Sequence, residues 1–154
     1  MNIENLAKQA TQLYLRGNYE SAGDCYAELA KVFSRMQHGM QAGFFFDASA
    51  SAYTLVSNLS TSKTDEAAMF CRAKNAHNMA ITTYASIHNY AMAAKQAVIA
   101  ASMCLTNRNY EEASTYYISA ANFYSAANLS LQSNQCMYHA QSMKDMANNV
   151  SQIE

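Results

Sequence analysis

The sequence contains no proline, no tryptophan and only four glycines in 154 residues, and charged side chains make up only 14% of it. Sandwiches and barrels of many β-strands need frequent Gly- and Pro-rich turns, so this shortage excludes them. No uninterrupted apolar run reaches the roughly 18 residues of a membrane-spanning helix. At 51% hydrophobic residues, with 11 Tyr and 6 Phe, the chain is too apolar to be disordered. These properties predict one all-helical domain over residues 1–154.

The charge balance and the cysteines limit the classes of function that the protein can have. Ten basic and eleven acidic residues give a net charge of −1, which provides no electrostatic footprint for nucleic acid or an acidic membrane surface. The N-terminus shows no basic segment followed by an apolar core, so we expect a cytoplasmic protein without a secretory signal. Four cysteines without a CxxC pair are then expected to be reduced, buried side chains. They are Cys25, Cys71, Cys104 and Cys136.

Hydrophobic periodicity divides the chain into seven helical stretches. Joints of two to six residues are too short to cross the length of a helix, so consecutive helices must run antiparallel. Asp65 three residues after Ser62 indicates a capping box at the longest polar joint. The expected helices cover residues 3–16, 19–37, 40–59, 65–87, 90–105, 110–127 and 130–150.

Three of the joints carry the same pattern, Asn-Tyr-x-x-Ala, at residues 18–22, 89–93 and 109–113. The Asn side chain caps the helix that follows, and at the first joint Gly17 suits a left-handed C-terminal cap. The Tyr fills the corner between two helices, and the small Ala allows a neighbouring helix to approach closely. Because one helical hairpin cannot bury both of its sides, such units stack.

This pattern resembles the tetratricopeptide repeat, in which an aromatic residue precedes a small residue by three positions. However, Tyr90 and Tyr110 lie 20 rather than 34 residues apart. That spacing is more similar to the soluble NSF attachment proteins (SNAPs), and residues 19–26 are similar to their aromatic-x-x-Ala-Gly segment. Residues 28–31 and the aromatic-rich third helix are also similar to the huntingtin-associated 40-kilodalton protein of the same superfamily. The resemblance implies antiparallel hairpins stacked in a right-handed solenoid, with Gly23 permitting close approach of backbones.

No arrangement of residues indicates catalysis or metal binding. The four histidines lie in four different segments without a His-x-x-x-His pair. Cys136 and His139 lie one helical turn apart and form at most half of a metal site. Phosphate loops, dinucleotide fingerprints and nucleophile elbows are absent from the sequence, so we expect a non-enzymatic protein with no cofactor and no metal.

Aromatic residues provide the candidate partner-binding positions. Phe44, Phe45 and Phe46 are consecutive and span about 200° of a helix, so one interface cannot hold all three. The conservative interpretation places Phe45 and Phe46 in the core and Phe44 against a neighbouring helix; the alternative directs one of them to a partner. Tyr116 and Phe123 form a second stripe beside the one expected to be core, and we expect this second stripe to bind a partner.

The methionines near helix ends have two interpretations, core filling or an adaptable binding surface, and we favour the core. They are Met36, Met40, Met143 and Met146.

The resulting hypothesis is a non-enzymatic adaptor or scaffold that binds a protein partner, itself expected to be helical. The SNAP resemblance implies a role in intracellular vesicle trafficking or complex assembly. A role in taking apart membrane-fusion helix bundles is less favoured, because it is expected to need basic patches and the ten basic residues are scattered. Two alternatives stay open: a structural protein that self-assembles through its end helices, and a small ligand- or metal-binding bundle. An exposed apolar first or last helix would favour self-assembly, so a homo-oligomer is possible.

Overall fold

The computed structural model describes residues 2–153, which contain seven α-helices and no strand. The all-α prediction is confirmed, with 88% of the described residues helical. Every helix begins and ends within three residues of its predicted bounds. The helices are α1 (Ile3–Leu15), α2 (Tyr19–Arg35), α3 (Gly39–Leu59), α4 (Lys63–Ser86), α5 (Tyr90–Thr106), α6 (Tyr110–Ala126) and α7 (Ser130–Ile153).

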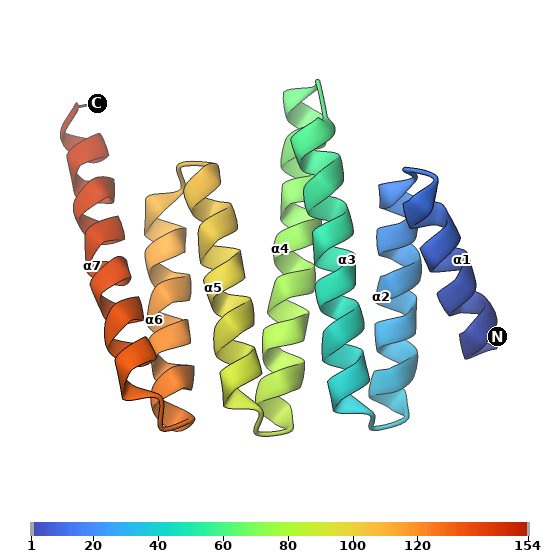
Figure 1. Ribbon diagram of the computed structural model, residues 1–154. Coiled ribbons are helices and arrows are strands. Elements are labelled where there is room, and N and C mark those ends of the chain that lie inside the picture. The colour runs from blue at the N-terminus through green and yellow to red at the C-terminus, as the bar shows by residue number, and fades with distance from the viewer. Residues whose placement is uncertain (1, 154) are drawn as a thin grey trace. The chain divides into compact units, whose positions relative to one another are not determined.

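The chain divides into two compact units, residues 1–87 with α1 to α4 and residues 88–154 with α5 to α7. In the first unit α2 packs between α1 and α3, and α3 packs on α4. In the second unit α6 packs between α5 and α7. Successive helices within each unit run in opposite directions (Figure 1), so each unit is a stack of antiparallel hairpins, as predicted. A single domain over residues 1–154 stays a prediction.

The tight joints share one backbone conformation. At the first joint the N–H of Gly17 donates to the Tyr14 carbonyl and the N–H of Asn18 donates to the Leu13 carbonyl, which is a Schellman motif. The same pair of bonds recurs at residues 37–38, 108–109 and 128–129. Gly17 has a φ of 81°, and four other joint residues have a φ of 57–61° although none is glycine. These four are Gln37, His88, Arg108 and Asn128.

Helix N-termini are capped as the sequence predicts. The side chains of Asn18, Asn89 and Asn109 each accept a hydrogen bond from the backbone N–H three residues later. Ser62 caps α4 in the same way through the N–H of Asp65. The residue that closes one helix therefore also caps the next, which explains how the chain turns without proline.

The core consists mainly of alanine, whose small side chain lets neighbouring helices approach closely. Cysteine burial was predicted correctly for Cys104 and Cys136, but Cys25 is only partly buried and Cys71 is exposed. All four are free thiols. The prediction for Cys71 was wrong because α4 buries the side that carries Met69 and Ala73, and Cys71 lies about 200° around the helix from Met69.

Candidate functional site

Helix α3 carries large apolar residues on its solvent-facing side as well as on its buried side. Among its 21 residues, Asp47 is the only one with a formal charge. A surface helix normally presents one apolar stripe to the core and charged or polar residues to solvent. The buried side of α3 follows Ala42, Phe46, Ser49 and Tyr53 and is explained by the contacts with α2 and α4. The opposite side therefore needs a separate explanation.

That opposite side carries six positions spaced by three or four residues, which we call the α3 stripe. Phe44 is 59% exposed and Leu59 is 68% exposed, while Met40 is about half exposed. Ala48 and Leu55 are partly exposed and Ser51 is exposed. At 1.5 Å per residue the stripe is about 28 Å long. Its members are Met40, Phe44, Ala48, Ser51, Leu55 and Leu59.

A cluster of stacked aromatic rings packs against Phe44, a member of the α3 stripe. The Phe45 ring stacks on Phe33 at 5.5 Å between centroids and on Tyr26 at 6.2 Å, joining α3 to α2. The Phe44 ring meets Phe45 edge-on at 5.2 Å. Phe46 is buried. Since an exposed ring held by other rings loses little freedom on binding, Phe44 is suited to anchoring a partner.

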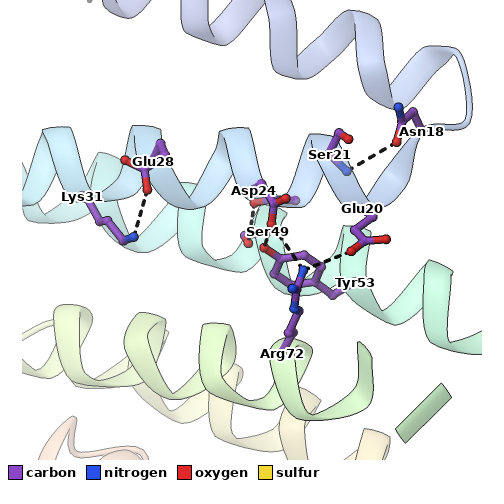
Figure 2. A network of polar contacts seen from close by, with 10 residues as sticks. Asn18, Glu20, Ser21, Asp24, Glu28, Lys31, Ser49, Tyr53 and Arg72 are labelled. Atoms are coloured by element: carbon purple, nitrogen blue, oxygen red, sulfur yellow. Dashed lines mark hydrogen bonds and ion pairs between the residues drawn. The ribbon is translucent and has the colours of Figure 1, made fainter. Parts of the chain in front are cut away.

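The position of α3 is fixed by a network of polar contacts between three helices, shown in Figure 2. The Tyr53 hydroxyl on α3 donates to Asp24 Oδ1 on α2 at 2.5 Å. Arg72 on α4 lies 3.2 Å from Glu20 Oε1 and 3.6 Å from Asp24 Oδ1, and its guanidinium lies over the Tyr53 ring at 5.7 Å. Burial and the hydrogen bond to Asp24 raise the pKa of Tyr53 to about 12. We call these residues, Glu20, Asp24, Tyr53 and Arg72, the polar clamp.

Two glycines make room for tyrosine rings at the contacts of α3. A Cβ atom on Gly23 of α2 would lie 2.7 Å from the Tyr53 ring, and one on Gly43 of α3 would lie 2.5 Å from Tyr84 of α4. The Ser49 hydroxyl also donates to the Gly23 carbonyl at 2.8 Å. Gly23 thus permits a close approach, as expected. The space that a side chain at this position would need is occupied by the Tyr53 ring of α3.

The three predicted partner-binding residues lie in different environments. Phe44 points outward on α3 and is the most exposed of them. Tyr116 and Phe123 are half-buried on α6, and the Phe123 ring stacks on Tyr90 of α5 at 6.3 Å. Phe44 belongs to the first unit, whereas Tyr116 and Phe123 belong to the second.

The preference for methionine in the core was wrong at three of the four positions considered. Met36, Met40 and Met146 are exposed, and only Met143 is buried. Met36 is exposed because it is the C-cap that follows α2, and Met40 because it lies in the first turn of α3 on its outer side, where no core lies. An adaptable thioether at such positions is typical of binding surfaces.

The described residues show no group of three or more His, Cys, Asp or Glu side chains that could hold a metal ion. The two halves of the Cys136–His139 pair face different environments. Cys136 is buried and burial raises the pKa of its thiol, whereas His139 is exposed and packs against the Tyr117 ring at 5.3 Å. In residues 2–153 no helix is both long and apolar enough to cross a membrane.

A comparison of the sequence with known families agrees with the stack of antiparallel hairpins and with the close contact at Gly23. Residues 2–152 match the family of soluble NSF attachment proteins (SNAP). The chain belongs to this family. A search of curated proteins gave no significant match. SNAP membership confirms the predicted superfamily, while the particular similarity to the huntingtin-associated protein stays a prediction.

Two features of the site were not predicted from the sequence, the α3 stripe and the polar clamp. Met40, Phe44, Ala48, Leu55 and Leu59 lie four or seven residues apart, so a second apolar periodicity on the outer side was available in the sequence. The clamp had no such signal, because its residues come from three helices and lie up to 52 residues apart.

Proposed function

We propose that this SNAP-family chain is a non-enzymatic adaptor that binds a helix of a protein partner along the α3 stripe. The observation that carries the proposal is the uncharged apolar row on the solvent side of α3, with Phe44 and Leu59 more than half exposed. Large exposed apolar rows on soluble proteins mark interaction sites. A row about 28 Å long matches about five turns of a partner helix, which would contribute apolar residues at the same three- and four-residue spacing.

The stripe also determines what kind of helix fits. Since the stripe carries no formal charge, an opposing charged side chain would lose its hydration without gaining an ion pair. The partner helix is therefore amphipathic with an apolar, uncharged contact side. Binding of this kind depends little on ionic strength. Membership of the SNAP family supports a setting in intracellular vesicle trafficking or complex assembly, in the cytoplasm.

A second, smaller surface on α6 stays part of the proposal. Tyr116 and Phe123 lie four and three residues from Ala120, on a flank that is only half-buried. The double variant Tyr116→Ala with Phe123→Ala is expected to weaken partner capture without unfolding the chain. If it unfolds the chain, these side chains belong to the packing of the second unit and the α6 surface is wrong.

The direct test is the substitution Phe44→Asp, with capture of partners measured by pull-down and mass spectrometry. A carboxylate in the middle of an apolar contact is expected to reduce capture of the specific partner by at least about tenfold, which corresponds to about 1.4 kcal/mol. The matched control is Leu15→Asp on α1, which is 80% exposed and lies outside the stripe. Circular dichroism and a thermal melt confirm that both variants fold.

Three outcomes are decisive. Loss of capture by Phe44→Asp and not by Leu15→Asp supports docking on the α3 stripe. Equal effects of the two variants, or no effect of either, contradict it. Loss that follows only from the Tyr116 and Phe123 double variant assigns the partner to α6 instead.

A further inference from the structure

The acidic residues of the chain, with one exception, have a partner or a favourable position within the fold. Of the eleven acidic residues, ten lie in residues 2–153. Four of these form ion pairs, and four others lie in the first turn of a helix, where the helix dipole favours a negative charge. Asp145 accepts a hydrogen bond from Gln141 Nε2 at 3.0 Å. The paired residues are Glu4, Glu20, Asp24 and Glu28, and those in first turns are Asp65, Glu66, Glu111 and Glu112.

The exception is Asp47, in the interior of α3. Within residues 2–153 its carboxylate forms no ion pair and no side-chain hydrogen bond. The residue is also partly buried. Aspartate is a poor residue for the interior of a helix, and partial burial of a charge without a partner is unfavourable. The folding of the chain therefore gives no reason for a charge at this position.

Asp47 borders the α3 stripe. It lies three residues after Phe44, about 4.5 Å further along α3 and about 60° around it. This flank of the stripe is the one next to α4, because a Cβ atom on Gly43, one turn earlier, would meet the Tyr84 ring of α4. Burial, and after it the charge of Asp47, raises the pKa of Tyr84. The opposite flank carries Phe45, which stacks on Phe33 of α2, so the stripe has one charged flank and one apolar flank.

We propose that the helix bound on the α3 stripe carries one Lys or Arg beside its apolar side, and that this cation pairs with Asp47. The inference rests on the proposed adaptor function and names the chemistry of its partner. The charge lies beside the apolar contact and not within it, so both the apolar row and the ion pair can form. The bound helix shields the pair from water, which strengthens a charge-assisted hydrogen bond. A partner with an acidic residue at the same place is repelled.

The position of Asp47 also determines the direction of the bound helix. The charge lies about 10 Å from the Met40 end of the stripe and about 18 Å from the Leu59 end. A helix turned end for end would carry its cation to the other flank, beside Phe45, where α3 has no charge. An apolar row by itself accepts a helix in either direction. The single ion pair therefore selects one direction out of two.

Selection from a library of displayed peptides tests the inference. Each peptide is an amphipathic helix about five turns long, with an apolar row at three- and four-residue spacing and with Lys, Gln or Glu at every flanking position. The bait is the full 154-residue chain. We expect the wild-type chain to enrich Lys over Gln at least about fivefold at one position of one flank. Asp47→Lys is expected to enrich Glu at that same position, and Phe44→Asp to enrich no peptide.

Binding of the selected peptide to single variants is the second measurement. Asp47→Asn is expected to bind it about fivefold more weakly and to lose the small dependence on salt that wild type shows. The matched control is Glu28→Gln, which removes one negative charge from the exposed side of α2 and is expected to change neither property. Asp47→Asn is expected to melt at no lower temperature than wild type, because the carboxylate has no partner to lose.

The outcomes separate this inference from the adaptor function on which it rests. Enrichment of the apolar row without a charge preference on either flank, or unchanged binding by Asp47→Asn, overturns the ion pair and leaves the adaptor function standing. A lower melting temperature of Asp47→Asn shows that the carboxylate serves the fold and overturns the inference as well. If the wild-type chain enriches no peptide, both the inference and the docking of a helix on the α3 stripe are wrong.

Discussion

Removal of the Tyr53 hydroxyl by Tyr53→Phe tests the polar clamp without disturbing the ring that packs on Gly23. The hydroxyl donates to Asp24, and a hydrogen bond to a charged group contributes about 1.5–3 kcal/mol. The Asp24 side chain is 58% exposed, so water replaces part of the lost bond. At pH 8 we therefore expect Tyr53→Phe to lower the free energy of unfolding by about 1 kcal/mol.

The pH dependence of this difference provides a sharper test. The pKa of Tyr53 is raised from 10.0 to about 12 in the folded chain, chiefly by burial. Because the pKa is higher in the folded chain, the stabilisation that the neutral Tyr53 phenol provides is complete at a pH below the pKa of the unfolded chain. It is lost as the pH rises toward the pKa of the folded chain. At pH 11 the unfolded phenol is largely ionised and the folded phenol is not, which lowers wild-type stability by about 1.4 kcal/mol. Tyr53→Phe lacks this titration.

The measurement is urea unfolding of both proteins at several pH values between 8 and 11. We expect the wild-type advantage of about 1 kcal/mol to disappear by pH 11. The control Tyr138→Phe removes an exposed hydroxyl and is expected to change stability at pH 8 by less than about 0.5 kcal/mol. A difference between wild type and Tyr53→Phe that stays constant from pH 8 to pH 11 would refute the role of burial and Asp24.

Two further predictions concern the backbone and the packing of single residues. Gly43→Ala is expected to lower the free energy of unfolding by about 1–2 kcal/mol, despite better helix propensity, because its Cβ would meet the buried Tyr84 ring at 2.5 Å; a stabilised variant in urea unfolding would contradict this. Arg108→Gly is expected to raise the melting temperature by relieving a left-handed φ of 57°, a gain of about 0.5–1 kcal/mol. Asn128→Gly is the matched control and should gain less, since Asn tolerates that conformation.

The fold was predictable because its signals are local. Asn18, Asn89 and Asn109 cap helices through the backbone N–H three residues later, and such short-range contacts can be recognised in a sequence. Gln37 and Arg108 adopt the same left-handed conformation at their joints although neither is Gly or Asn. Their Schellman geometry depends on the helices that they connect, so the residue type does not indicate it.

The candidate site was predictable only in part. Phe44 was recognised because three consecutive phenylalanines cannot share one interface. The exposure of Cys71 and Met40 depends on which side of α4 and α3 packs against neighbouring helices, and the sequences of these helices do not confine their apolar residues to one side that would reveal it. The low charge content has a structural counterpart in the α3 stripe, which is uncharged and at least partly exposed along its length.

Photo-cross-linking along α3 tests the central claim most directly. A photoreactive phenylalanine analogue is placed at Phe44, Leu55 or Leu59 in the full chain, with Leu15 as the control position, and the linked partner peptides are identified by mass spectrometry. Positions 44 and 59 lie about 22 Å apart along α3. We predict links from both positions to one helix of one partner, at sites about 15 residues apart. Links no stronger than those from position 15, or links scattered over unrelated segments, would contradict docking of a helix on the α3 stripe.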